Sequence, residues 1–395
     1  MSDSRKFSRV CILGLGYIGL PTAAVLAKAG FEIHGVDINP EVIKIINSGR
    51  IHIIEPDLLE AVSEAVKTKK LKAALKPEIS DVYIIAVPTP FYHESKKPNI
   101  EYVLSATESI ANLIKPGDLV ILESTSPVGT TEKMADLLKS KGVDINQIFI
   151  AHCPERVLPG QILHELVHND RIVGGINSQA TDLAAEFYEK FVKGKILKTN
   201  ARTAELCKLS ENAYRDVNIA FANELSMVCE DLNIDIWELR ELANHHPRVN
   251  ILQPGCGVGG HCIAVDPWFI VDASDKAKLI KTAREQNLAK TDWVIQKLEA
   301  QIKKLAKPNK DISIACLGAS FKPNIDDIRE SPAKFIIDAV KSLGVKTLVV
   351  EPNLENLDGY ELVGLTQALN QADISIKLVS HREFEGVVCD IETVG

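Results

Sequence analysis

The sequence predicts an α/β protein in which two parallel-sheet domains flank a region of long helices. Strand-length apolar runs alternate with helical segments in the N-terminal part of the chain. Residues 203–231 then keep apolar side chains at helical spacing, and a second series of strands and helices begins at residue 312. The chain of 395 residues is long enough for two or three hydrophobic cores. We therefore expect domains at 1–200, 201–305 and 306–395.

Composition excludes several classes of protein. The net charge is −8 and no basic run is long, so we expect neither a nucleic-acid partner nor insertion into a membrane. The longest apolar runs are the length of strands, and residues 1–9 do not resemble a signal peptide. The eight cysteines show no CxxC pair and no disulfide-like spacing. This cysteine usage indicates reduced thiols and a cytoplasmic location.

A glycine-rich turn joins the first predicted strand, residues 10–13, to the first predicted helix, residues 20–27. Gly14 would make the tight turn, Gly16 would let the backbone approach a pyrophosphate, and Gly19 would let the helix pack on the strand. The helix N-terminus would face the phosphate charge. This pattern is the dinucleotide fingerprint of a Rossmann domain, and its turn also contains Tyr17 and Ile18.

Asp37 follows the second predicted strand, residues 31–36. An acid at this separation from the glycines accepts hydrogen bonds from the adenosine ribose and disfavours a 2′-phosphate. The sequence therefore predicts NAD as the cofactor, rather than NADP. The alternative is a strand–turn–helix unit that binds nothing.

Hydroxyl side chains follow two further predicted strands, residues 82–87 and 119–122. Ligands bind beyond the carboxyl ends of such strands. We therefore expect contacts with the dinucleotide or the reacting centre from Thr89, Thr125 and Thr131. The alternative is that these threonines only cap turns and helices.

Glu155 and Arg156 follow another predicted strand, residues 148–151. One could orient a water molecule while the other binds a sugar or phosphate oxygen. The alternative is a salt bridge within the loop.

The predicted helix of residues 203–231 carries Lys208 and Asn212 four residues apart, with Thr203 as its expected N-cap. Arg215 lies beside the face that they share. A lysine and an amide on one face can stabilise an oxyanion. The alternative is an ordinary solvated face.

Cys262 ends a glycine-rich loop that begins at residue 255, and Asp266 follows it by four residues. Glycines permit close approach of a ligand, and a thiolate can attack an aldehyde carbon. The alternative is a small buried apolar side chain. His245, His246 and His261 lie near Cys262 in the sequence, but their spacing matches no common zinc pattern, so we expect no metal.

The C-terminal part contains predicted strands at 312–318 and 347–350 and a helix that begins with Ser331 as N-cap. It lacks a second glycine fingerprint. Lys322 and Arg329, in the loop before that helix, could supply charge for a second ligand. The alternative is a purely structural domain.

Seven motifs in order give the whole chain a resemblance to the UDP-glucose/GDP-mannose dehydrogenase family: GLGYIGLP, AVPTP, ESTSPVG, PERVLPG, CKLSENAYRDVNIAFANE, GVGGHCIAVDP and FKPNIDDIRES. The resemblance implies that a sugar C6 alcohol is oxidised to a carboxylate with two NAD, through a thiohemiacetal and a thioester on Cys262. It implies that Lys208 and Asn212 stabilise the oxyanion and that Asp266 assists the thiol or the water. Glu155 and Thr125 would position that water.

The resemblance also implies a UDP-amino-sugar substrate. The wording of IHIIEPDL, HPRVNILQPG and GGHCIAVDPWF favours UDP-N-acetylmannosamine. UDP-N-acetylglucosamine, another nucleotide sugar, and an inactive protein that binds NAD and a sugar nucleotide remain alternatives. Pro159 stands where the glucose-specific branch has a second glutamate. The implied substrate-binding residues are Arg156, Val157, Lys208, Asn212, Arg215, His246, Arg248, Gly259, Phe321 and Lys322.

Two arginines have further roles implied by the resemblance. Arg248 would reach across a homodimer, and Arg329 would reach back to NAD. Cys256 is a second thiol in the loop of Cys262. The family pattern assigns the nucleophile to the GGHC position, so Cys256 is expected to serve packing.

Overall fold

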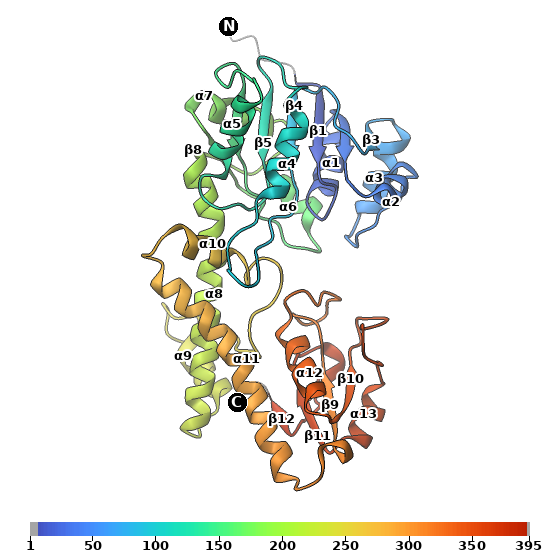
Figure 1. Ribbon diagram of the computed structural model, residues 1–395, viewed down its shortest axis with the longest axis vertical. Helices are drawn as coiled ribbons and strands as arrows, with labels where there is room; N and C mark the ends of the chain where they lie inside the picture. The colour runs from blue at the N-terminus through green and yellow to red at the C-terminus, as the bar shows by residue number, and fades with distance from the viewer. Residues whose placement is uncertain (1–6, 393–395) are drawn as a thin grey trace. The chain divides into compact units, whose positions relative to one another are not determined.

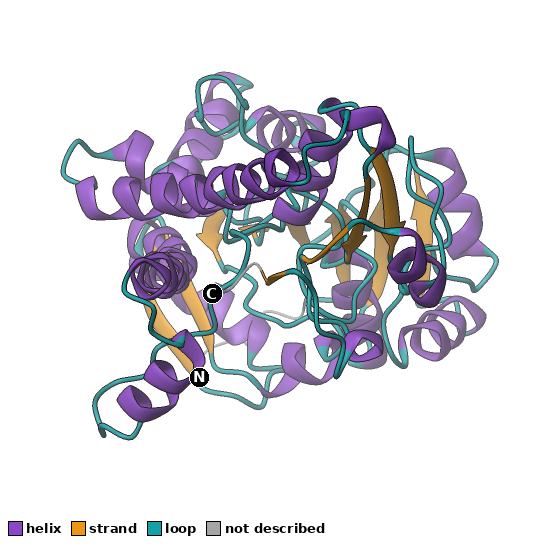
Figure 2. Ribbon diagram, turned by 90° about the horizontal axis from the view of Figure 1, so that it is seen from below, coloured by secondary structure: helices purple, strands orange, loops and turns teal. Residues whose placement is uncertain are grey.

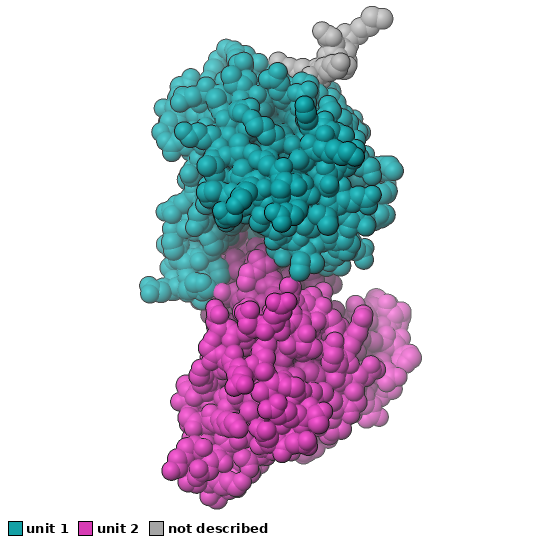
Figure 3. Space-filling model, turned by 90° about the vertical axis from the view of Figure 1, so that its right-hand side faces the viewer, with its two compact units in different colours: residues 1–210 teal, residues 211–395 magenta. Residues whose placement is uncertain are grey.

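The computed structural model describes residues 7–392. The chain divides into two compact units, which we call unit 1, ending at Ser210, and unit 2, beginning at Glu211 (Figure 3). The boundary lies within the long helix α8, Ala201–Asp231 (Figure 1). Unit 2 combines the central helices with the second sheet, and each unit is described by itself below.

Unit 1 is built on one sheet of eight strands in the order β3-β2-β1-β4-β5-β6-β7-β8. Neighbouring strands are parallel except β6 and β7, which are antiparallel. The strands are β1 Arg9–Leu13, β2 Glu32–Val36, β3 Leu71–Ala74, β4 Val82–Ile85, β5 Leu119–Leu122, β6 Phe149–His152, β7 Arg171–Gly175 and β8 Ile196–Asn200.

Helices lie on both faces of this sheet (Figure 2), since its strands are apolar on both sides. Val10 and Ile12 pack into the core on one face, while Cys11 and Leu13 pack into the core on the other. Continuous apolar strands of this kind are typical of parallel sheets that are covered on both sides. The helices are α1 Gly19–Lys28, α2 Pro40–Asn47, α3 Leu58–Lys67, α4 Glu101–Ile110, α5 Thr130–Ser140, α6 Ile162–His168 and α7 Ser178–Tyr188.

Unit 2 contains most of α8, the central helices and a parallel sheet in the order β10-β9-β11-β12. Its strands are β9 Ser313–Leu317, β10 Lys346–Val350, β11 Ile374–Lys377 and β12 Ile391–Glu392. Its further helices are α9 Ile236–Asn244, α10 Asp266–Ala273, α11 Lys278–Lys304, α12 Pro332–Ser342 and α13 Leu365–Gln371, with short 3-10 turns at Asn309–Asp311 and Arg382–Phe384.

The predicted fold class is confirmed: a Rossmann-type sheet, long central helices and a second parallel sheet. Ser331 caps α12 by accepting the N–H of Lys334, as expected. The cap predicted for the long helix is wrong. The helix begins at Ala201, and the Asn200 side chain, rather than Thr203, accepts a backbone N–H, that of Thr203 at 2.9 Å. Within residues 7–392, no helix combines the length and the apolar character needed to cross a bilayer.

Candidate active site

The glycine-rich turn between β1 and α1 has the geometry of a dinucleotide-binding loop. A Cβ on Gly19 would lie 1.8 Å from the Gly14 carbonyl oxygen, so the helix and the turn approach as closely as glycine permits. A Cβ on Gly16 would meet no atom within 4 Å, so the space beside Gly16 is open. Helix α1 has no side-chain cap and no acidic residue in its first turn. Its first N–H groups are therefore suited to bind a phosphate.

Asp37 lies at the end of β2, beside this turn. Its Oδ2 accepts the backbone N–H of Leu15 at 3.1 Å, and its Oδ1 accepts the N–H of Asn39 at 2.9 Å. These bonds fix the half-buried carboxylate next to the glycines. The residues present therefore fit NAD: open backbone for the pyrophosphate and an acid for the ribose.

The three threonines predicted near the cofactor have different surroundings. Thr89 donates its hydroxyl to the carbonyl oxygen of Thr125 at 2.5 Å, which joins the loops that follow β4 and β5. Both side chains are half-buried. Thr131 is fully buried in the first turn of α5, and its hydroxyl donates to Glu205 of α8 at 2.6 Å.

Glu155, just beyond β6, belongs to a buried ion cluster. Its Oε2 accepts from Nη2 of Arg171 at 2.5 Å, and its Oε1 accepts the N–H of Arg156 at 2.7 Å. Nη1 of Arg171 lies 3.4 Å from Oε1 of Glu123. The Tyr188 hydroxyl donates to the same Glu123 oxygen at 2.6 Å. Glu155 thus pairs with Arg171, which lies 16 residues further along the chain.

The strand reversal explains how Arg171 reaches Glu155. Ala151 pairs with Gly175 and His152 with Gly174 in the antiparallel β6–β7 ladder. Each step forward along β6 is one step back along β7, so the same register places position 155 opposite position 171. The first residue of β7 therefore lies at the carboxyl end of β6, where ligands of such sheets bind.

Burial perturbs the acids and bases of this cluster. It raises the pKa of Glu123 to about 7, although Arg171 opposes the shift and Glu155 adds to it. It also lowers the pKa of the neighbouring His152 to about 3, which keeps that ring neutral. One Glu123 oxygen and both ring nitrogens of His152 have no hydrogen-bond partner within the described part of the chain. The cluster therefore places the Arg171 guanidinium between Glu155 and a Glu123 whose protonated form burial favours.

In unit 2, the glycine-rich loop before Cys262 packs against the segment that leads to α12. A Cβ on Gly259 would lie 2.7 Å from Cβ of Phe321, and one on Gly260 would lie 2.9 Å from the Phe321 ring. The Gly260 N–H also donates to the Arg329 carbonyl at 2.9 Å. Only glycine fits at these positions, so the loop lies directly on Phe321. The structure thus brings two of the predicted substrate residues, Gly259 and Phe321, together.

The two thiols of this loop differ in environment. Cys262 is half-buried, and its carbonyl oxygen accepts the N–H of Asp266 at 2.8 Å. The Asp266 carboxylate accepts from the Asn212 amide of α8 at 2.6 Å, so two predicted catalytic residues are in direct contact. Cys256 is buried in the apolar core of unit 2, and burial raises the pKa of its thiol to about 12. A thiol with such a pKa is a poor nucleophile at neutral pH.

Apart from Asn212, which is buried, the other predicted residues lie on exposed or half-exposed surface. Lys208 and Asn212 occupy successive turns of α8 on one face, as expected. Arg329 pairs with Asp327 at 2.6 Å. Arg156 donates from Nη1 to the Asp170 carbonyl at 3.2 Å. The exposed members of the predicted substrate set are Arg215, His246, Arg248 and Lys322, and Val157 is half-buried.

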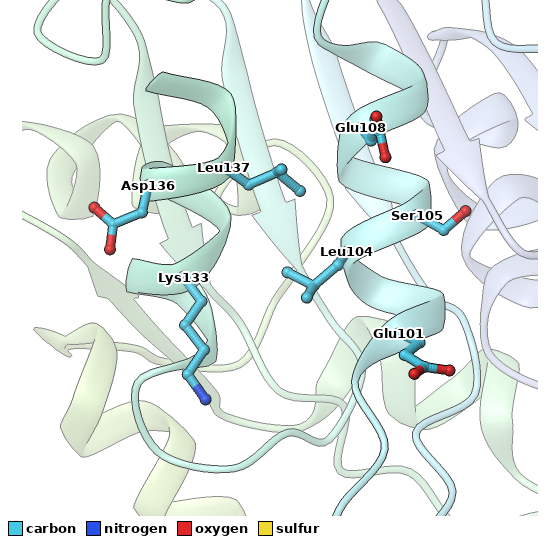
Figure 4. Close-up of a pocket in the computed structure, with 7 residues that line it drawn as sticks. All are labelled: Glu101, Leu104, Ser105, Glu108, Lys133, Asp136 and Leu137. Carbon is cyan, nitrogen blue, oxygen red and sulfur yellow. The ribbon is translucent and has the colours of Figure 1, made fainter. Parts of the chain in front are cut away.

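A groove of about 500 Å³ lies elsewhere, between α4 and α5 (Figure 4). Its lining consists of Glu101, Leu104, Ser105, Glu108, Lys133, Asp136 and Leu137. None of these residues belongs to the predicted site. The groove is formed by the outward faces of two helices, and we assign it no role in the reaction.

Comparison with known proteins identifies the family. Residues 8–192 match the NAD-binding domain of the UDP-glucose/GDP-mannose dehydrogenase family, residues 202–289 match its central domain, and residues 315–394 match its UDP-binding domain. The chain belongs to this family. The resemblance seen in the motifs is thereby confirmed, and so is NAD as the cofactor of the N-terminal domain.

Members of the family with similar sequences include two kinds of enzyme. The UDP-N-acetyl-D-mannosamine dehydrogenase of Campylobacter jejuni is 53% identical, and the alignment covers 98% of each chain. The NDP-N-acetyl-D-galactosaminuronic acid dehydrogenase of Ralstonia nicotianae is 52% identical, over 97% of this chain and 93% of the relative. The solved UDP-D-ManNAc dehydrogenase of Pyrococcus horikoshii superposes with a TM-score of 0.90 at 40% identity, over 96% of this chain and 91% of that one.

Proposed function

We propose that the protein oxidises UDP-N-acetyl-D-mannosamine at C6 to UDP-N-acetyl-D-mannosaminuronate, with two NAD and one water per sugar. The observation that carries the proposal is the half-buried Cys262 in its glycine-lined loop, four residues before an Asp266 that is bonded to Asn212. A nucleotide-sugar oxidation that stops at the aldehyde would need no such thiol. The similarity to UDP-N-acetyl-D-mannosamine dehydrogenases over nearly the whole chain supports the choice of sugar.

The proposed chemistry assigns a role to each side chain. NAD, when bound, accepts one hydride in each of the two oxidations. The Cys262 sulfur adds to the aldehyde carbon, a C–S bond forms, and the carbonyl oxygen gains a proton to give a thiohemiacetal. That carbon then loses a hydride and its hydroxyl loses a proton, which gives a thioester. Water then attacks the thioester, the C–S bond breaks, and the thiol regains its proton as the acid leaves.

Lys208 and Asn212 stabilise the oxyanions that form in the capture and hydrolysis steps, since both are donors on one face of α8. Asp266 assists the thiol or the water, while Glu155 and Thr125 position the water. Thr89 and Arg329 complete the NAD site. Thr131 is fully buried and bonded to Glu205, so it would support that site through the first turn of α5 and not by direct contact. The nucleotide sugar is bound by the substrate residues named above, among which Gly259 and Phe321 are in contact.

The experiment is the number of NADH formed per sugar consumed, measured separately with the UDP-linked mannosamine, glucosamine and galactosamine N-acetyl sugars. We expect about two NADH and a strong preference for the mannosamine epimer. Cys262→Ser should lose the thioester route, and Cys256→Ser should retain it. Two NADH from Cys262→Ser would refute the covalent mechanism, and preference for another epimer would change the substrate only.

We also propose that the enzyme is a homodimer that forms through α8 and α9. Three large side chains at seven-residue spacing on α8 are exposed, Tyr214 by 71%, Phe221 by 55% and Val228 by 44%. Residues seven apart share one helix face, so these form an apolar stripe that water would otherwise cover. On α9, the apolar side chains of Trp237 and Leu242 are also exposed.

Sedimentation of Phe221→Glu tests the dimer. A charge in a buried apolar interface should yield monomers at micromolar concentration. Leu75→Glu is the matched control, since Leu75 is exposed by 53% in unit 1, outside the stripe. Identical sedimentation of the two variants would contradict the proposed interface.

A cytoplasmic location completes the proposal, because a nucleophilic thiol needs a reducing compartment. None of the eight cysteines, all within the described residues, forms a disulfide. A product of this kind would supply the uronic acid of a bacterial surface polysaccharide.

A further inference from the structure

The glycine-rich loop of Cys262 is tied at both ends to a chain of buried hydrogen bonds between α8 and α11. At its start, the Gly255 N–H donates to Oδ1 of Asn223 at 2.8 Å. The Asn223 amide donates to Oδ1 of Asn287 at 2.9 Å. The Asn287 amide donates to Oδ1 of Asp216 at 2.8 Å and to its carbonyl oxygen at 3.1 Å.

The same chain ends on the other side of Cys262. Nη1 of Arg284 donates to Oδ1 of Asp216 at 2.7 Å and lies 3.4 Å from the carbonyl oxygen of Ile263. The four side chains, which we call the loop ladder, are Asp216 and Asn223 of α8 and Arg284 and Asn287 of α11. Each is at most 1% exposed. The ladder therefore runs without a break from Gly255, before the thiol, to Ile263, immediately after it.

The polarity of the ladder is fixed. The Gly255 N–H can only donate, so the oxygen of the Asn223 amide must face it and the NH₂ must face Asn287. The Asn287 oxygen accepts that bond, so its NH₂ must face Asp216. Asp216 is a carboxylate whose oxygens only accept, and the positive Arg284 keeps it paired. Neither amide can turn over without setting donor against donor or acceptor against acceptor.

We propose that the loop ladder positions the Cys262 thiol for capture of the aldehyde. This inference rests on the proposed function and concerns residues that do not touch the substrate. Every hydrogen bond along the ladder is made, although Oδ2 of Asp216 and Nε of Arg284 have no partner within the described residues. A displaced ladder residue would leave further unpaired groups in the interior, which favours the one arrangement observed. The ladder would therefore hold the backbone on both sides of Cys262 at the distance that C–S bond formation requires. A loop that moved by about 1 Å would capture more slowly and let the aldehyde escape.

Two other polar contacts of α11 can be compared with the loop ladder. Thr291 of α11 donates to the Cys256 carbonyl at 2.9 Å, which anchors a third backbone group of the same loop. Further along the same two helices, Lys297 pairs with Glu230 at 2.6 Å without contact to the loop. The helices are thus joined by polar contacts of two kinds, and those nearest Cys262 are the ones that also bind loop backbone.

The test is the fate of the aldehyde in Asn287→Asp. This change keeps the shape of the side chain but sets oxygen against Asp216. We expect the NADH yield to fall from about two toward one per sugar, with free aldehyde trapped by hydroxylamine. The double variant Asp216→Asn, Asn287→Asp restores a donor opposite an acceptor and should recover part of the yield. Loss of stability alone would reduce both oxidations together and release no aldehyde.

The controls separate the possible outcomes. Lys297→Met removes a polar contact of the same helix pair away from the loop and should keep two NADH per sugar. If Asn287→Asp does not fold, Thr291→Val provides a milder loss of one loop anchor and should release aldehyde. Two NADH from both Asn287→Asp and Thr291→Val, with Cys262→Ser reduced to one, would overturn the ladder and leave the covalent mechanism intact. Two NADH from Cys262→Ser would instead overturn the proposed function.

Discussion

Glu205 of α8 supplies a cap for α5 that α5 itself lacks, and this contact supports a quantitative prediction. The N-cap position of α5 is a glycine, without a side chain to accept its first N–H groups. The Glu205 carboxylate is fully buried and accepts the N–H of Gly129 at 2.6 Å and the N–H of Thr131 at 2.8 Å. Glu205→Ala would leave both N–H donors buried and unpaired, whereas the Thr131 hydroxyl, which also donates to Glu205, can rotate toward another acceptor.

The expected cost follows from those two groups. Each buried unpaired donor costs about 1–3 kcal/mol, which gives about 2–6 kcal/mol for the pair. Burial raises the pKa of Glu205 despite the hydrogen bonds from Thr131 and Gly129, so the wild-type carboxylate already carries a desolvation cost that the variant loses. We therefore expect the lower part of the range, about 2–4 kcal/mol, for the unfolding of unit 1. Glu205→Gln, which keeps one acceptor oxygen, should fall between wild type and alanine.

Arg202→Met is the matched control. Arg202 lies one turn earlier on α8 and forms an exposed pair with Glu132 of α5 at 2.6 Å. Exposed pairs contribute about 0–1 kcal/mol, so this variant should be nearly neutral. The assays are urea unfolding by far-UV circular dichroism and hydrogen exchange of residues 129–134. The reasoning is refuted if Glu205→Ala loses no more stability than Arg202→Met, or if exchange in the first turn of α5 is unchanged.

Three further changes have definite expected outcomes. Gly19→Ala should lower both the melting temperature and the affinity for NAD, whereas Gly16→Ala, with open space around it, should weaken NAD binding in calorimetry and leave the melting temperature unchanged. Although burial opposes the shift, hydrogen bonds led by that from His381 lower the pKa of Glu351 to about 2. The free energy of unfolding of unit 2 should therefore decrease by about 3 kcal/mol as pH falls from about 4.5 to 2. Glu351→Gln should flatten that pH dependence. Tryptophan fluorescence is the assay, because all three tryptophans lie in unit 2. Burial raises the pKa of Glu123 to about 7, so the folded state holds a proton that the unfolded state releases. Stability should decrease as pH rises from about 4.5 to 7, and Glu123→Gln should remove that decrease in thermal melts.

Local patterns were sufficient to predict the parts of the fold whose cause is local. The turn at Gly14, Gly16 and Gly19 follows from steric requirements within six residues, and the Ser331 cap follows from four. Lys208 and Asn212 share a face because one helix carries both. These features needed no knowledge of distant segments.

Arg171 and the loop ladder could not be predicted in this way. Arg171 reaches Glu155 only because β7 runs antiparallel to β6, and strand direction is decided by the packing of the whole sheet. Asn223 and Asn287 lie 64 residues apart and meet through the contact of α8 with α11. Polar residues inside a helix were the available signal, since a buried asparagine needs a partner. A buried asparagine predicts that a hydrogen-bond partner exists, but which residue it is depends on the tertiary fold.

The reversed strand β7 also has a consequence for insertions and deletions. The segment between β6 and β7 can change in length without moving Arg171, because the ladder of Ala151 with Gly175 fixes the register from the far side. One residue inserted between Arg171 and Val173 would instead turn the guanidinium to the opposite face of the sheet. Variation in length among enzymes of this kind should therefore accumulate in residues 158–170, after the proposed substrate residues, and be excluded from β7. The position of the Arg171 guanidinium beside Glu155 is thus fixed by the alternation of side chains along β7, and does not depend on the conformation of a loop.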